Sequence, residues 1–224
     1  MKRKYALYPI IMSFCALVCF AAVVMVFAGA VQPLWGRIML LALPALILGV
    51  IALLAAKGRL GATATTIWTT ILSVLLLLGS IFYVLLLSVW TATTTTTDIQ
   101  YYIRAYAQID EVEAVEGIFP KTIPAEAQNI VFTYNPQFLQ GGEIFELSYT
   151  TTNEKITEWT SLLIEEAEWI GSNHQWYSEN NWSFDGVEAT RYLLYWDGGF
   201  NHGEMCYVLI DESMERITFY YSIW

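Results

Sequence analysis

Three long apolar tracts near the N-terminus constrain the fold of this chain more than any other feature. They cover about residues 5–28, 38–56 and 67–90, and none contains a charged residue. A helix of about 20 apolar residues crosses the hydrocarbon core of a bilayer. A charge at its centre would cost about 2.5–3.5 kcal/mol on insertion scales. The tracts therefore predict three transmembrane helices within residues 1–90, in contact with the lipid bilayer.

The charges of the chain divide sharply at Asp98. All 21 acidic residues lie at or after this position, whereas six of the 11 basic residues precede it, so the two parts carry +6 and −16. This break predicts a domain boundary, with residues 91–97 as a threonine-rich linker and residues 98–224 as a separate acidic domain. A domain of charge −16 would repel phosphates, which argues against nucleic acid as a partner.

The basic residues also predict the orientation of the helices. Three of them lie at positions 2–4, before the first tract, and Lys57 and Arg59 lie between the second and third tracts. The loop between the first two tracts contains only Arg37. Because basic loops stay in the cytoplasm, we expect a multi-pass plasma-membrane protein with a cytoplasmic N-terminus and an extracytoplasmic C-terminal domain.

The first tract has an alternative interpretation as a cleaved signal peptide, because the small residues at positions 28–30 fit a cleavage site. Its apolar region is longer than the 7–15 residues usual for a signal, which favours an uncleaved anchor.

Cys15 and Cys19 lie one helical turn apart in the first apolar tract. Phe14 and Val18 precede them, where a lipoprotein site has a small residue, so we interpret both cysteines as apolar side chains.

The threonine run from Thr93 to Thr97 is compatible with two structures. It could prolong the third helix, with each hydroxyl bonded to the preceding turn. Alternatively, the sequence from Thr97 to Gln100 matches a capping box, which predicts a new helix over about residues 98–108. The expected apolar face of that helix contains Ile99, Tyr102, Ile103 and Tyr106.

The acidic domain has about 127 residues, enough for one ordinary domain. Period-2 alternation predicts strands over about residues 130–134, 143–150, 190–196, 204–210 and 216–224. Helical periodicity predicts a helix from Glu154 to Ile170 that is capped by Asn153. This order predicts a membrane-anchored α+β fold, in which three transmembrane helices precede an extracytoplasmic domain with a mostly antiparallel sheet of about five strands and two helices.

The best candidate binding surface is the polar, aromatic loop from Asn173 to Asp185. Aromatic faces flanked by amides suit a glycan or a peptide ligand, whereas the competing interpretation is that the rings complete the core. The candidate ligand-binding residues are His174, Trp176, Tyr177, Trp182, Phe184 and Asp185.

No motif predicts catalysis, a metal or a cofactor: G-x-S-x-G, P-loop and H-E-x-x-H patterns are all missing from the sequence. One turn contains Asp197, Asn201, His202 and Glu204, but a zinc site usually needs three or four well-placed ligands. A glycosidase needs two facing carboxylates. Two acidic groups could supply them, although we expect most of their charges to face solvent: Glu111, Glu113 and Glu116, and Glu165, Glu166 and Glu168.

Three functions are compatible with this organisation. The first is an extracytoplasmic binding or sensing domain that is tethered to the membrane. The second is an accessory subunit of a membrane transport or secretion complex, because three helices exceed what a tether needs. Small residues at Ala45, Gly49 and Ala52 could form its helix-packing face. The third is a hydrolase that depends on the carboxylates of the outer domain.

Overall fold

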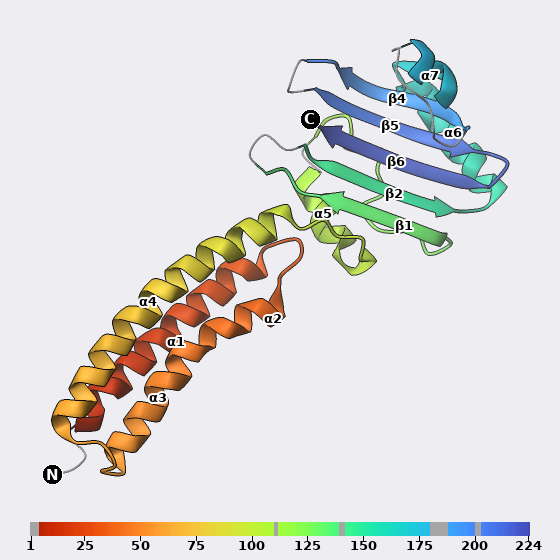
Figure 1. The fold of residues 1–224 in the computed structure, drawn as a ribbon. Coiled ribbons are helices and arrows are strands. Elements are labelled where there is room, and N and C mark those ends of the chain that lie inside the picture. Colours follow the sequence, from red (N-terminus) through yellow and green to blue (C-terminus); the bar gives the residue numbers. More distant parts are fainter. Residues whose placement is uncertain (1–4, 110–111, 139–141, 180–187, 200–202) are drawn as a thin grey trace. The chain divides into compact units, whose positions relative to one another are not determined.

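Figure 1 shows a helical N-terminal unit, Met1–Thr91, and a C-terminal unit built on a β-sheet, Ala92–Trp224. The predicted membrane-anchored α+β fold is confirmed, because long apolar helices are followed by an antiparallel sheet with a few helices. The computed structural model describes residues 5–109, 112–138, 142–179, 188–199 and 203–224.

Three helical spans in the described part of the chain are long and apolar enough to cross a membrane, as predicted for a multi-pass protein. The first is α1 (Leu7–Ala28) and the third is α4 (Ala62–Thr93). The second span is composite. It contains α2 (Trp35–Ile38), the 3-10 turn η2 (Met39–Ala42) and α3 (Leu43–Ala56). Pro44 lies in the first turn of α3, where its missing N–H breaks no helical hydrogen bond.

Helices α1 and α3 pack together through small residues. The Ser13 hydroxyl donates a hydrogen bond to the carbonyl of Ala45 at 2.8 Å. A Cβ atom added to Gly49 would lie 3.5 Å from the same hydroxyl, and Ala52 is buried. Small side chains let two membrane helices approach closely. The predicted helix-packing face is thus confirmed, and the chain uses it for its own α1–α3 contact.

Helix α4 is attached to the other two at two places along its length. The hydroxyls of Tyr8 and Thr70 lie 3.3 Å apart in its first half. In its second half, the Tyr83 hydroxyl donates to the carbonyl of Arg37 at 3.1 Å. A cluster of buried apolar residues adds to this second attachment: Phe27, Ile38, Leu41 and Leu87.

The threonine run leaves α4 and pairs with the sheet. The helix ends at Thr93. Thr96 then donates its backbone N–H to the carbonyl of Tyr134 at 2.9 Å and accepts the N–H of Tyr134 at 2.8 Å. The Thr95 hydroxyl donates to the side-chain oxygen of Asn135 at 2.9 Å. Most of the run therefore breaks the helix and lies along the edge strand β1 (Gln128–Asn135).

The next helix begins one residue later than the capping box predicts. Asp98 is the cap, because its carboxylate accepts the backbone N–H of Gln100 at 3.1 Å. A 3-10 turn, η3 (Ile99–Tyr101), comes before α5 (Tyr102–Ile109).

The predicted apolar face of this helix is confirmed for Tyr102 and Tyr106, which are buried, but not for its two isoleucines. Ile99 and Ile103 are exposed. The buried residues have the i, i+3, i+4, i+7 spacing of one α-helical face, and Ile103 lies beside this face rather than on it. The buried residues of α5 are Tyr102, Ala105, Tyr106 and Ile109.

The described part of the sheet has six antiparallel strands in the order β1-β2-β6-β5-β4-β3. Five of them correspond to predicted strands, and β3 was not predicted. The remaining strands are β2 (Ile144–Thr150), β3 (Trp169–Ser172), β4 (Thr190–Asp197), β5 (Glu204–Asp211) and β6 (Arg216–Ile223).

Strand β3 takes the place of the end of a predicted helix. Helix α6 (Asn153–Glu166) stops before Ala167, whose backbone is extended. Ile170, predicted on the helix, instead pairs with Tyr192 of β4. The cap also differs, because the Thr152 hydroxyl accepts the N–H of Lys155 at 3.4 Å and Asn153 is the first helical residue.

The core lies between one face of the sheet and the helices α5 and α6. Tyr102 of α5 contacts Phe132 with ring centroids 5.5 Å apart, and Trp159 of α6 contacts Phe219 at 5.1 Å. The predicted inward faces of two strands are confirmed as buried: Phe145, Leu147 and Tyr149 on β2, and Ile217, Phe219 and Tyr221 on β6.

Candidate functional site

The predicted aromatic site lies partly on a short helix, α7 (Asn173–Glu179). Trp182, Phe184 and Asp185 lie outside the described residues. His174 is exposed. Trp176 is only 6% exposed and packs edge-on against Trp169 and Trp196, with ring centroids 5.3 and 5.4 Å apart. Its ring is therefore part of the packed interior of the unit.

A buried arginine, which sequence reasoning missed, organises the aromatic rings of this region. Arg191 is 1% exposed, and its guanidinium carbon lies 3.9 Å from the ring centroid of Tyr207. The rings of Trp176 and Tyr177 lie 5.4 and 5.3 Å from it. The Nε atom donates to the side-chain oxygen of Asn173 at 2.9 Å. Trp176 and Tyr177 thus enclose a cation of the chain itself.

A carboxylate lies on the same face of the sheet. Glu146 of β2 pairs with Tyr220 of β6, which in turn pairs with Tyr207. Burial raises the pKa of Glu146 above its ordinary value of 4.5. The folded state therefore favours the protonated carboxyl. The preference of the folded state for the protonated Glu146 carboxyl stabilises the protein at low pH. This stabilisation is fully present below pH 4.5, and it is lost as the pH rises through the higher pKa that Glu146 has in the folded state.

We expect Glu146→Gln to stabilise the protein at pH 7, because glutamine is neutral like the protonated carboxyl. The gain should be no more than about 1 kcal/mol, since water partly screens this half-buried charge. The difference between variant and wild type should disappear toward pH 4. Urea unfolding followed by tryptophan fluorescence from pH 4 to 7.5 measures it. A gain of the same size at both ends of this range would contradict the prediction.

A polar recess in the second unit is an acidic pocket of about 660 Å³. Five glutamates from three parts of the chain line it together with a tyrosine and four small or apolar residues. Its lining residues are Val112, Glu113, Ala114, Glu116, Ile118, Glu166, Glu168, Leu194, Tyr195 and Glu204.

The segment after α5 supplies two of these glutamates. It forms consecutive turns, in which the carbonyl of Val112 accepts the backbone N–H groups of Val115 and Glu116 at 2.9 and 3.0 Å. Val115 is fully buried and anchors the turn, while Glu113 and Glu116 are exposed. The Cys206 thiol lies 3.5 Å from the carbonyl of Ala114 and connects this segment to β5. The turn therefore directs both carboxylates away from the core.

The end of α6 supplies two more glutamates. The N–H of Ala167 donates to the carbonyl of Leu163 at 3.0 Å and closes the last helical turn. The next N–H, that of Glu168, donates to the carbonyl of Leu193 on β4 at 2.8 Å. The chain thus changes from helix to strand between Glu166 and Glu168, and both side chains remain at the pocket.

An irregularity in β4 places two further residues in the wall of the acidic pocket. Leu193 pairs with Tyr207 and Tyr195 pairs with Cys206, so Leu194 is an extra residue in this strand. In a regular strand, successive side chains point to opposite faces. The bulge re-aims the chain locally, so that Leu194 and Tyr195 line the same pocket. Glu204, at the start of β5, adds the fifth carboxylate.

The pocket is strongly negative. No basic residue is present among its described lining residues. Partial desolvation and the charges of Asp197, Glu204 and Glu168 raise the pKa of Tyr195, so its hydroxyl stays protonated. Burial and the charge of Glu204 raise the pKa of Cys206, which keeps this thiol neutral and unsuited to act as a nucleophile.

The pocket unites residues that the sequence analysis treated as two acidic groups. Glu113 and Glu116 lie with Glu166 and Glu168, whereas Glu165 does not line the pocket and Glu111 lies outside the described residues. In the parts of the chain that are described, no three His, Cys, Asp or Glu side chains are placed to hold one metal ion. Asn201 and His202 of the turn considered for zinc lie outside those parts. The carboxylates therefore surround a volume rather than converge on a point.

The fold defines a membrane-anchored α+β protein with three apolar helices and an antiparallel sheet. No family model, curated protein or solved structure matches the chain.

Proposed function

We propose that this protein is an integral membrane protein of the cell surface that displays an acidic domain for binding cationic ligands. Its N-terminus would lie in the cytoplasm and its sheet-containing unit outside. Lys57 and Arg59, in the turn between α3 and α4, support this orientation because basic loops stay in the cytoplasm.

The orientation has a direct test in two cysteine variants of the full chain. Met214→Cys, at an exposed position in the β5–β6 turn, should react with a membrane-impermeant maleimide on intact cells. Lys57→Cys should react only after the cells are opened. The native Cys206 is buried and should stay unlabelled. The reverse labelling pattern would refute the proposed orientation.

One observation carries the ligand assignment: five glutamates and no described basic residue line a pocket of about 660 Å³. Ligand pockets typically have volumes of about 300–1,000 Å³. Because the carboxylates are distributed around the pocket, they suit a ligand with several separated positive charges better than a single chelated ion. A polyamine or a lysine- and arginine-rich peptide has this chemistry.

The expected binding is electrostatic and sensitive to salt. Four of the five glutamates are exposed, and an exposed ion pair contributes about 0.2–1 kcal/mol. Several such pairs together give measurable affinity, which weakens as salt shortens the Debye length to about 8 Å at physiological ionic strength. The Tyr195 ring offers an additional face to a cation.

Fluorescent pentalysine provides a defined probe. The full chain in detergent should bind it, and the variant with Glu113, Glu116, Glu168 and Glu204 changed to Gln should bind it at least roughly 30-fold more weakly. Four lost pairs at about 0.5–1 kcal/mol each correspond to that factor or more. Fluorescence anisotropy at low and at physiological salt measures both affinities.

A matched control variant distinguishes binding in the pocket from attraction to the net charge of the domain. Glu154, Glu165, Glu188 and Glu212 are exposed and do not line the pocket, and changing all four to Gln alters the net charge by the same amount. This control should retain most of the affinity. Equal losses in the two variants would show that pentalysine responds only to the net charge of the domain, and the proposed site would be wrong.

A second function, a carboxylate-dependent hydrolase, is favoured by one observation: the two acidic groups share one pocket. Two neighbouring carboxylates can act as the general acid and general base in the hydrolysis of a peptide bond, as they do in aspartic proteases. Mass spectrometry of the pentalysine recovered from the binding assay tests whether the pocket cleaves this peptide. Cleavage that disappears in the four-glutamine pocket variant would replace binding with hydrolysis as the function.

A further inference from the structure

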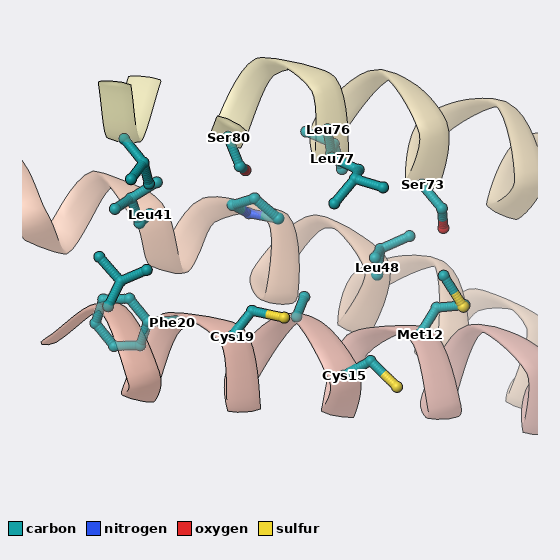
Figure 2. Close-up of a pocket in the computed structure, with 14 residues that line it drawn as sticks. Met12, Cys15, Cys19, Phe20, Leu41, Leu48, Ser73, Leu76, Leu77 and Ser80 are labelled. Atoms are coloured by element: carbon teal, nitrogen blue, oxygen red, sulfur yellow. The ribbon is translucent and has the colours of Figure 1, made fainter. Parts of the chain in front are cut away.

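A second cavity lies inside the membrane unit, between α1, α3 and α4. Figure 2 shows side chains from helices on opposite sides that point toward one another across it. Its volume is about 160 Å³. All three helices line it, among them α1 through Cys15, Ala16 and Cys19 and α4 through Ser73, Leu77 and Ser80.

The cavity lies at the middle of all three spans. The centres of Leu7–Ala28, Trp35–Ala56 and Ala62–Thr93 fall at about residues 18, 46 and 78. The lining residues of each span lie on both sides of these centres, as Cys15 and Cys19 do on α1. In a bilayer this depth corresponds to the centre of the hydrocarbon core, about 15 Å from either interface. The medium available to fill the cavity there is hydrocarbon.

Small side chains on α1 and α4 leave this space open. Helix α4 is attached through Tyr8 and Thr70 in its first half, and through Tyr83 and the carbonyl of Arg37 in its second half. Between these attachments, Ala16 and the serines of α4 are too short to fill the gap. A void without partner atoms loses dispersion contacts, so an occupant of matching shape would restore them.

The lining is almost entirely carbon and sulfur. Its polar side chains are the hydroxyls of Ser73 and Ser80, which Figure 2 shows on the side of α4 that faces the other helices. The Ser73 hydroxyl is buried and has no hydrogen-bond partner in the described structure. A buried water needs two to four polar partners. The cavity therefore excludes stable water and favours an apolar occupant.

We propose that this cavity binds the end of one hydrocarbon tail of a membrane lipid. An apolar cavity of about 150 Å³ accepts benzene, so this one has room for roughly six tail carbons. The side chains of Cys15, Cys19 and Leu77 are exposed at its rim, so the cavity is open on the lipid-facing surface. A tail enters from the bilayer without leaving the hydrocarbon.

Photocrosslinking tests this site in the full chain, reconstituted in phosphatidylcholine vesicles with a phospholipid that carries a diazirine at the end of one acyl chain. Irradiation followed by peptide mass spectrometry should place adducts mainly on cavity-lining residues of α1 and α4. The double variant Ser73→Leu with Ser80→Leu fills the cavity and should lose these adducts. Ala16→Leu, which fills it from α1, should have the same effect.

Two matched variants add the same side chains outside the cavity. Ser88→Leu on α4 and Ala21→Leu on α1 change exposed residues that do not line it, and both should keep the adducts. Monodisperse elution of every variant confirms that the bundle is intact. Adducts spread evenly over the exposed residues of the three spans, or unchanged in the filled variants, would overturn the proposal.

Discussion

Replacing Phe219 with alanine should lower the free energy of unfolding of the sheet-containing unit by about 3–5 kcal/mol. The Phe219 side chain is fully buried at the centre of the core. Its ring lies 5.3 Å from that of Phe119, 5.1 Å from Trp159 and 6.0 Å from Tyr149. The substitution removes all three contacts and leaves a cavity, which is a large effect compared with the 5–15 kcal/mol that stabilises a typical domain.

Urea unfolding of the full chain in detergent, followed by tryptophan fluorescence, measures this loss. Phe82→Ala provides the matched control, because Phe82 lies on α4 and is 64% exposed. It should leave the unfolding midpoint of the second unit unchanged. A loss of less than about 1 kcal/mol in Phe219→Ala would mean that the core can collapse around the missing ring.

Arg191→Ala should destabilise the same unit by about 3 kcal/mol. The change removes the cation stacked on Tyr207 and the hydrogen bond that Arg191 donates to the Asn173 side-chain oxygen. A hydrogen bond from a charged group contributes about 1.5–3 kcal/mol, and the space left between the rings adds a cavity term. Arg191→Met should cost less than Arg191→Ala, because methionine loses the same hydrogen bond to Asn173 but fills most of the space between the rings.

The contrast between the two Arg191 variants is the informative measurement. Both remove the charge, and only alanine removes most of the volume. If the two variants lose equal stability in urea unfolding, the interactions that both lack stabilise this region more than the packing of the side chain does. These interactions are the hydrogen bond to Asn173 and the cation–π contacts, of which that with Tyr207 at 3.9 Å is the shortest.

Local patterns predicted the elements whose structure depends on local rules. The alternation of Phe145, Leu147 and Tyr149 identified a buried strand face, because a strand on a core needs apolar side chains at every second position. The end of α6 does not follow such a rule. Helical periodicity continues to Ile170, but the chain turns at Ala167 because Glu168 bonds to Leu193, a distant residue on β4.

The acidic pocket was predictable only in pieces. The clusters around Glu113 and Glu166 are visible in the sequence, yet their meeting depends on the turn after α5 and the bulge at Leu194. The burial of Arg191 was not predictable from the sequence, because arginine is rarely buried. The alternation of side chains along β4 is equally compatible with an exposed arginine at this position. Hydropathy likewise predicted the membrane spans but not the small residues that leave a cavity between them.

The pairing of Thr96 with Tyr134 has a consequence for neighbouring copies of the protein. An open strand edge presents unpaired N–H and C=O groups to any other chain, and this is a common route to aggregation. The threonine run occupies part of the β1 edge, and at the opposite edge β3 has only four residues. Copies of the protein that are confined to one membrane meet frequently. The partly covered edge at β1 and the short edge strand β3 therefore limit pairing between the sheets of neighbouring copies.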